Sequence, residues 1–196
     1  MAKRDIDFLF EMGSLRLIDR LWTRFFSPHM QNQTEHMFRV FWVAMVIAAR
    51  EGGVDTGKVA KMALMHDIGE SRTGDVDMLS RQYVVRNDDL GMSDVLSDTS
   101  LETEFLALWK EYEKRESLEA KIVKDADNLD CDFELEEQRA MGSKLPETVQ
   151  ETRDHIAKTK LFTKAAKEIF DELHTTNAHA WFMNARNRMN AGDWKK

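Results

Sequence analysis

The sequence has very little cysteine, proline or glycine. Of 196 residues, one is cysteine, two are proline and nine are glycine. The single cysteine, Cys131, cannot form an internal disulfide, which favours a reducing compartment, and we therefore expect a cytoplasmic protein. A fold of many short strands and tight turns requires more glycine and proline than this, so the composition favours long helices.

Long hydrophobic runs and an excess of positive charge are also absent. The longest apolar run, residues 40–49, is too short to cross a bilayer, and the first residues lack the apolar stretch of a secretory signal. Lysine and arginine number 28 against 35 aspartates and glutamates, a net charge of −7. Because nucleic acid and anionic membranes are bound through basic patches, we expect neither as a partner.

The chain shows helical patterns without a linker between them, and we predict one all-α domain over residues 1–196. The strongest pattern covers residues 34–51, ends at two glycines and is apolar on nearly all sides. This predicts a central helix with Trp42 in the core. No window alternates long enough to predict a strand.

Capping signals and apolar spacing predict the other helices. They are expected within residues 5–21, from 55 or 56 to 66, from 102 to 114 with a capping box of Thr99 and Glu102, from Ser117 to near Gly142, from Pro146 onward, and once or twice within 160–189. Residues 86–99 are polar and carry four aspartates, so they are interpreted as a surface loop.

Candidate chemistry begins at the pair His66 and Asp67, which Glu70 follows. Residues four apart share a helix face, so His66 and Glu70 are expected to point the same way. Imidazole nitrogen and carboxylate oxygen suit a divalent ion such as Mn²⁺, Co²⁺, Fe²⁺ or Zn²⁺. A nearby carboxylate can accept the proton of a water bound to such an ion. A His-Asp pair occurs by chance in many proteins, so by themselves these residues favour a polar helix end.

Two further segments strengthen the metal hypothesis. His36 stands at the start of the apolar run, at the expected rim of the core, where backbone contacts alone would also satisfy a histidine. Asp127 lies between Ala126 and Leu129 on the apolar stripe of the long helix, and a buried carboxylate there needs a cation or hydrogen-bond donors. Its neighbours Asp125 and Asp130 fit a solvated acidic face better.

Together these segments resemble the HD-domain metal phosphohydrolases, which carry a lone histidine, a His-Asp pair about thirty residues later and a distant aspartate. The matching segments are Thr34-Glu35-His36-Met37-Phe38-Arg39-Val40, His66-Asp67-Ile68-Gly69-Glu70-Ser71-Arg72-Thr73-Gly74-Asp75 and Lys124-Asp125-Ala126-Asp127. They are similar to the 5′-deoxynucleotidase subgroup, which removes phosphate from deoxynucleoside 5′-monophosphates. The core motifs span residues 34–130, and the helices expected in 146–190 would pack on them.

The resemblance implies one divalent cation, whether Mn²⁺, Co²⁺, Mg²⁺, Zn²⁺ or Fe²⁺, and a homodimer. The residues expected to hold the cation are His36, His66, Asp67 and Asp127. Glu70 would orient or deprotonate the attacking water. Arg20 would bind the phosphate and Asp75 the sugar, with Val76, Asp77 and Met78 lining the same pocket.

The sequence departs from the family at one point. The family places a tryptophan directly after the phosphate-binding arginine, whereas here Leu21 separates Arg20 from Trp22. Trp22 therefore stays only a candidate for the base side, and Arg24 or Arg39 could replace Arg20.

Two other functions remain open from the sequence. An HD-type triphosphate or pyrophosphate hydrolase would use the same metal ligands, because pocket walls decide the length of the phosphate chain. A helical module that binds metal or nucleotide without turnover is the second alternative. The presence of all four ligand candidates and of Glu70 favours an enzyme.

Overall fold

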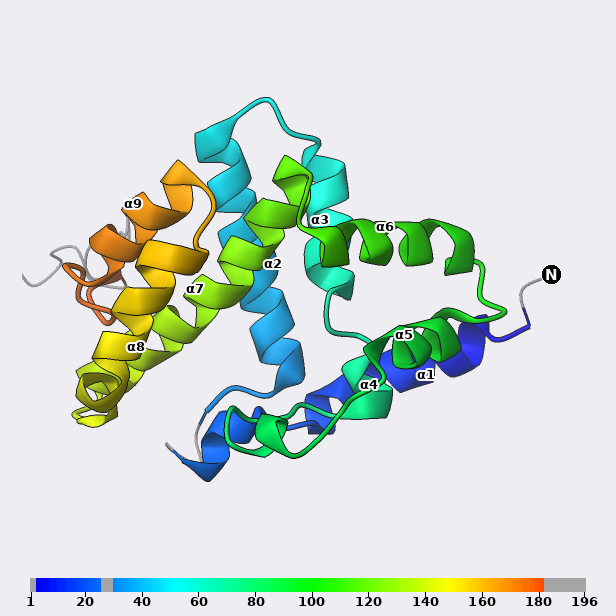
Figure 1. The fold of residues 1–196 in the computed structure, drawn as a ribbon, viewed down its shortest axis with the longest axis horizontal. Helices are drawn as coiled ribbons and strands as arrows, with labels where there is room; N and C mark the ends of the chain where they lie inside the picture. The colour runs from blue at the N-terminus through cyan, green and yellow to red at the C-terminus, as the bar shows by residue number, and fades with distance from the viewer. Residues whose placement is uncertain (1–2, 26–29, 182–196) are drawn as a thin grey trace, which may run out of the picture.

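All regular elements in residues 3–25 and 30–181, the part of the chain that the structure describes, are helices (Figure 1). In this computed structural model the α-helices are α1 Asp5–Ser14, α2 Gln33–Glu51, α3 Thr56–Met65, α4 Glu70–Thr73, α5 Asp88–Leu96, α6 Glu102–Lys114, α7 Leu118–Ala140, α8 Leu145–Lys160 and α9 Lys164–Leu173. Short 3-10 helices are η1 Leu15–Leu17, η2 Leu21–Arg24 and η3 Ser80–Gln82. The predicted all-α fold is confirmed.

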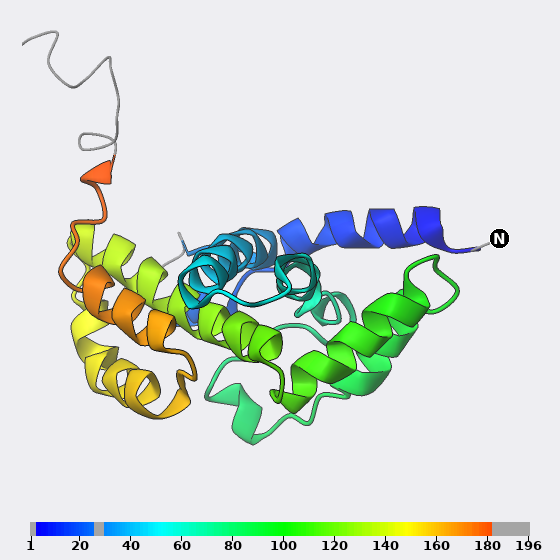
Figure 2. The ribbon, with the colours of Figure 1, turned by 90° about the horizontal axis from the view of Figure 1, so that it is seen from above.

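The two longest helices, α2 and α7, pack against each other at the centre and α3 packs on both. Figures 1 and 2 place α8 and α9 at one end of the molecule and α1, α5 and α6 at the other. One apolar core runs between the helices, with Val40, Ile47, Met62, Ile122 and Leu129 among its fully buried side chains. None of the helices in the described ranges has the length and apolar character required to span a bilayer.

The start of α2 is fixed by a capping box. The Asn32 side chain accepts a hydrogen bond from the Glu35 backbone N–H, and the Glu35 carboxylate accepts one from the Asn32 N–H. Two of the free N–H groups at the helix start are satisfied in this way. The helix ends where Gly52 adopts a positive φ of 70°. The predicted bounds were therefore nearly correct, and His36 lies in the first turn.

The prediction that Trp42 lies in the core is wrong. Trp42 is 54% exposed, and Phe38 and Val46, one turn before and after it, are 61% and 46% exposed. Helix α2 contacts α3, α7 and α9 with one side only, so its apolar residues on the other side have no helix to cover them in the described chain. An all-round apolar pattern does not tell how many sides of a helix receive a neighbour.

The predicted loop over residues 86–99 is also wrong, since α5 forms within it. The Asn87 side chain caps the helix by accepting from the Leu90 N–H. Met92, Val95 and Leu96 are fully buried, and this i, i+3, i+4 spacing holds α5 on the core despite its aspartates. Gly91 allows the close contact with α4, because a Cβ at that position would lie 2.8 Å from a Thr73 methyl carbon.

Helix α6 forms where predicted, but without the predicted capping box. The Thr99 hydroxyl donates to the Leu96 carbonyl and accepts from the Leu101 N–H, whereas a capping box would have it accept from the Glu102 N–H. The Glu102 carboxylate accepts from the Asp98 N–H, so the polar side chains close the preceding turn.

The C-terminal helices begin as their caps predicted. The Ser117 hydroxyl accepts from the Ala120 N–H at the start of α7, and Pro146 lies in the first turn of α8. Helix α9 accounts for the first part of the predicted helical tail. The helical prediction for residues 182–190 lies outside the described residues.

Asp125 was expected on a solvated face, but it is fully buried on α7. Its carboxylate accepts hydrogen bonds from the Phe162 N–H at 2.8 Å, from the Thr163 N–H at 2.8 Å and from the Thr163 hydroxyl at 2.7 Å. These contacts tie the junction between α8 and α9 to the central helix.

We predict that Asp125→Ala lowers the free energy of unfolding by about 3 kcal/mol, because three buried donors lose their acceptor. Urea denaturation measures this loss. Asp171→Ala, at an exposed position on α9, is the control and should change the free energy by less than about 0.5 kcal/mol. A loss below about 1 kcal/mol for the Asp125 variant would contradict the anchoring role.

Candidate metal centre and its cavity

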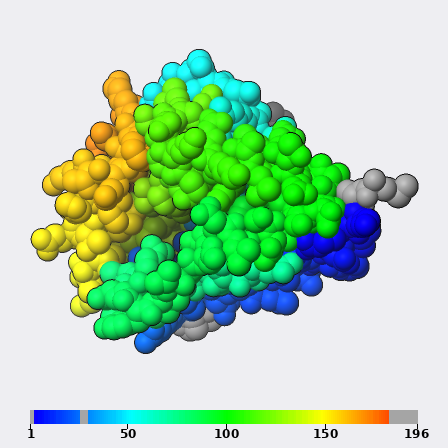
Figure 3. Space-filling view, turned by 45° about the vertical axis from the view of Figure 1, so that its right-hand side comes forward, coloured from blue at the N-terminus to red at the C-terminus, as the bar shows by residue number. Residues whose placement is uncertain are grey.

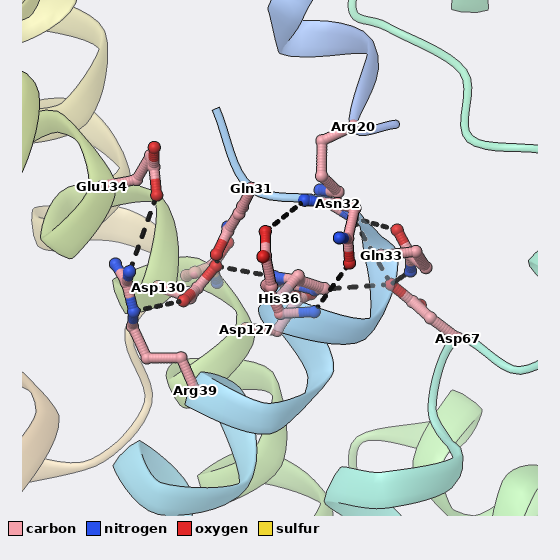
Figure 4. Close-up of polar contacts among 12 residues, drawn as sticks. Arg20, Gln31, Asn32, Gln33, His36, Arg39, Asp67, Asp127, Asp130 and Glu134 are labelled. Carbon is pink, nitrogen blue, oxygen red and sulfur yellow. Dashed lines mark hydrogen bonds and ion pairs between the residues drawn. The ribbon is translucent and has the colours of Figure 1, made fainter. Parts of the chain in front are cut away.

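Four side chains from three parts of the chain meet at one point. His36 comes from the first turn of α2, His66 and Asp67 follow the end of α3, and Asp127 lies in the middle of α7. One ligand atom from each lies within 4.8 Å of the others. His36 Nε2 is 3.4 Å from His66 Nε2 and 3.4 Å from Asp127 Oδ1. Figure 4 shows His36 with Asp127 directly beside it and Asp67 to its right.

The electrostatics of the cluster suit a bound cation. Burial raises the pKa of Asp67, but the charge of His66 and a hydrogen bond to His36 outweigh burial and hold the pKa well below its ordinary value. Burial acts in the same way on Asp127, where the charge of Lys124 leads the opposing effects and again lowers the pKa. Both carboxylates are therefore ionised. Two anionic oxygens and two imidazole nitrogens form a donor set that fits a divalent ion of the Mn²⁺ to Zn²⁺ series.

Neighbouring groups hold the candidate ligands in place. His66 Nδ1 lies 2.8 Å from the Ala63 carbonyl oxygen, so its Nε2 is the atom that faces the cluster. The Gln33 amide donates to Asp67 Oδ2 at 2.9 Å, and Lys124 Nζ donates to Asp127 Oδ2 at 2.6 Å. Such contacts orient metal ligands before the ion binds.

Glu70, the predicted catalytic carboxylate, begins α4 and is buried. Arg86 donates to its Oε1 at 2.8 Å, while Oε2 is buried with no hydrogen-bond partner among the described residues. Burial, and then the negative charges of Asp67 and Asp75, raise the pKa of Glu70 to about 8 against the opposing effect of Arg86. One oxygen of Glu70 is thus held by Arg86, and the other has no partner in the described chain.

The cluster opens into a cavity of about 660 Å³. Figure 3 shows the hollow between α8, α7 and the segment that follows α4. The sequence-predicted residues that line it are Arg20, Trp22, His66, Asp67, Glu70, Asp75, Val76, Asp77, Met78 and Asp127. Cys131 also lines the cavity, and burial raises the pKa of its thiol to about 12, so it stays protonated.

The structure places Arg20 beside the cluster. Its Nη1 lies 3.6 Å from Asp67 Oδ2 and donates to the Gln33 side chain at 3.2 Å. Asp75 Oδ2 accepts from the Leu21 N–H at 3.0 Å and lies 3.9 Å from Arg20 Nε. Asp75 therefore holds the segment that carries both Arg20 and Trp22 against the cavity.

The two alternative phosphate ligands are less well placed. Arg24 pairs with Asp77 at 3.2 Å, and its side chain is 54% exposed. Arg39 pairs with Glu137 at 2.8 Å and lines a second cavity, of about 450 Å³, that does not include the metal cluster. Arg20 is the arginine whose guanidinium lies next to the candidate metal ligands.

Sequence reasoning missed three of these contacts. Gln33 stands three residues before His36, and Lys124 three before Asp127, so a shared helix face was a usable signal for both. Arg86 reaches Glu70 only because the chain returns over the cavity before α5, and local spacing contains no signal for such a contact.

Comparison with known proteins places these residues in a family. A model of the HD domain matches residues 12–170. The chain belongs to the HD domain family. The 5′-deoxynucleotidase HDDC2 of Danio rerio is 30% identical over 152 residues, with 74% of each chain covered. The human protein of the same name is 28% identical over 162 residues, covering 80% of this chain and 78% of the relative.

A solved structure agrees with this assignment. The predicted metal-dependent phosphohydrolase of Magnetospirillum magnetotacticum superposes with a TM-score of 0.68 at 25% identity, covering 86% of this chain and 90% of its own. The motifs of His36, the His66-Asp67 pair and Asp127 therefore predicted the HD family correctly. The general class that the resemblance implied, a metal-dependent phosphohydrolase, is confirmed with it.

We predict that a divalent ion stabilises the fold through this cluster. Mn²⁺ at about 100 times its dissociation constant should raise the melting temperature by about 5 to 10 °C, because only the folded chain assembles the four ligands. Differential scanning calorimetry with and without a chelator measures the shift. Asp67→Asn should abolish it, and Asp171→Asn on the surface should retain it. An unchanged shift in Asp67→Asn would place the ion elsewhere.

Proposed function

We propose that the protein hydrolyses deoxynucleoside 5′-monophosphates to deoxynucleosides and inorganic phosphate. The observation that carries the proposal is the meeting of three groups in one cavity. Asp67 of the candidate metal cluster, the unpartnered Oε2 of Glu70 and the guanidinium of Arg20 all line it. The names of the HDDC2 relatives supply the substrate class.

In this reaction water attacks phosphorus and the bond to the 5′ oxygen of the sugar breaks. His36, His66, Asp67 and Asp127 would hold the divalent ion. Such an ion supplies an acidified water molecule and screens a phosphate oxygen. Glu70 takes the proton of the attacking water through Oε2, while Arg86 keeps Oε1 in place. The leaving 5′ oxygen takes up that proton and departs as the alcohol.

The remaining groups orient the nucleotide. Arg20, held near Asp67 and Asp75, offers a planar donor to the phosphate oxygens that are not attacked. Asp75 has one oxygen occupied by the Leu21 N–H, and its other oxygen accepts from a sugar hydroxyl. Trp22 supports the base side of the cavity. The cavity volume, about 660 Å³, is within the range of small-molecule sites.

We predict metal-dependent release of inorganic phosphate from deoxynucleoside 5′-monophosphates. Chelated protein resupplied with Mn²⁺, Co²⁺, Mg²⁺ or Zn²⁺ is assayed on deoxy- and ribonucleoside mono- and triphosphates. Glu70→Gln should lower kcat by about 10² to 10⁴-fold, because the amide cannot accept the proton of water. Glu104→Gln, at an exposed position on α6, is the matched control and should leave kcat unchanged.

The phosphate species that is released distinguishes the proposed activity from the two alternative functions. Pyrophosphate or triphosphate released from triphosphates would replace the proposal with a hydrolase of longer phosphate chains. Metal binding without turnover of any nucleotide would instead indicate a non-catalytic module. Full activity in Glu70→Gln would contradict the role given to that carboxylate.

We also propose that residues 1–196 form one HD domain, that this domain is cytoplasmic and that it is a homodimer. One apolar core that includes both Phe8 and Ile169 supports the single domain. The single cysteine and a nucleotide substrate support the cytoplasm. The dimer is supported by the exposed stripe of Phe38, Trp42 and Val46 on α2, since contiguous apolar surface of this kind marks interaction sites.

We predict that Trp42→Glu converts the dimer into a monomer, because it puts a charge at the centre of the apolar stripe. Light scattering coupled to gel filtration measures the mass. Leu9→Glu on α1, at a site that is 63% exposed, is the control and should leave the mass unchanged. A wild-type monomer would refute the dimer, and a dimeric Trp42→Glu would place the interface elsewhere.

A further inference from the structure

Asp130 is a buried carboxylate directly behind the candidate metal cluster. Its Oδ2 lies 2.6 Å from His36 Nδ1, and the side chains of Asp130 and His36 are 1% and 0% exposed. It stands one helical turn after Asp127 on α7, so one helix face presents both carboxylates to the same imidazole. Figure 4 shows Asp130 and Asp67 on opposite sides of His36. The solvated position expected for Asp130 is therefore wrong.

We propose that Asp130 is a positioning residue that makes His36 a metal ligand of fixed orientation. The inference rests on the proposed metal centre but concerns a residue outside the four candidate ligands. A neutral imidazole has one N–H and one lone pair, and the group bonded to one nitrogen decides what the other presents. With Nδ1–H donating to Asp130, Nε2 is the nitrogen that faces the cluster, 3.5 Å from Asp67 Oδ2, and its lone pair would bind the ion in place of a proton.

The two histidines differ in this respect. His66 Nδ1 faces a neutral acceptor, the Ala63 carbonyl oxygen at 2.8 Å, whereas His36 Nδ1 faces a carboxylate at 2.6 Å. A charged acceptor binds an N–H more strongly and increases the electron density on the opposite nitrogen. Asp130 thus makes His36 the more basic of the two nitrogen donors and holds its ring against rotation.

Asp130 is itself held from the side that faces away from the nucleotide cavity. The Gln31 amide donates to the same Oδ2 that contacts His36. Arg39 Nε lies 3.5 Å from Oδ1, which has no hydrogen-bond partner among the described residues. The Glu134 carboxylate lies 3.6 Å from Arg39 Nη2, so Arg39 is paired with a second carboxylate as well. Neither Asp130 nor Gln31 lines the cavity of Glu70 and Arg20, so Asp130 acts only through His36.

The test compares Asp130→Asn and Asp130→Ala with the wild type. Asp125→Asn is the matched control, because Asp125 is equally buried on the same helix but bonds only the α8–α9 junction. Titration calorimetry of the chelated proteins with Mn²⁺ gives the dissociation constant, and circular dichroism gives the folded fraction. Kinetics at saturating Mn²⁺ separate KM for a deoxynucleoside monophosphate from kcat.

We expect Mn²⁺ binding to weaken by roughly 10- to 100-fold in Asp130→Ala and by less in Asp130→Asn, whose amide oxygen still accepts from Nδ1. KM at saturating metal should stay unchanged, because Asp130 does not line the cavity. Asp125→Asn should melt earlier but bind Mn²⁺ like the wild type. If Asp130→Ala does not fold, Asp130→Asn alone decides.

Wild-type affinity for Mn²⁺ in folded Asp130 variants would overturn the inference and leave the metal centre intact. An equal loss of affinity in Asp125→Asn would also overturn it, because the effect would then be general destabilisation. A wild-type protein that binds no Mn²⁺ would refute the metal centre and this inference together. Failure of the nucleotidase assay with normal Mn²⁺ binding would affect only the proposed function.

Discussion

The packing of three helices around one buried charge cluster is the constraint on which the rest of the structure depends. Burial makes the ionised forms of Asp67 and Asp127 less favourable, but both carboxylates stay ionised because His36, His66 and Lys124 face them. Helices α2, α3 and α7 must therefore keep their relative positions to within the reach of a hydrogen bond. The capping box at Asn32 and the apolar core that α2 shares with α3 and α7 provide that precision.

The metal cluster has different neighbours on its two sides. One side faces the substrate cavity, and the other holds the ligands in place. On the cavity side lie Arg20 and Glu70, each with a buried polar atom that has no hydrogen-bond partner in the described chain. On the other side Asp130 faces His36, backed by Gln31 and Arg39. Both sides have buried polar atoms without a partner in the described chain, but those of Arg20 and Glu70 belong to residues that line the substrate cavity, whereas Asp130, Gln31 and Arg39 do not line it. An acidic protein can bind an anionic substrate here because Arg20 and the site for the divalent ion lie together at the cavity.

Tertiary context also decided which acidic residues are functional and which are structural. Asp125, Asp127 and Asp130 occur within six residues of one helix and are chemically alike in the sequence. In the fold, Asp125 binds the junction of α8 and α9, Asp127 joins the cluster, and Asp130 contacts His36. Their different partners follow from the different neighbours that α7 meets around its circumference, which a single-helix pattern does not contain.

The sequence by itself determined the helices with local signals and the family with its motif. Caps at Asn32 and Ser117 are local hydrogen bonds, and the words around His36, the His66-Asp67 pair and Asp127 are readable in linear order. Only the tertiary structure decided that Trp42 is exposed, that residues 88–96 form a helix, that Arg86 holds Glu70 and that Asp130 lies behind His36. The physical reason is that burial and long-range hydrogen bonds depend on which element packs against which side, whereas capping and helical spacing depend only on residues within a turn or two.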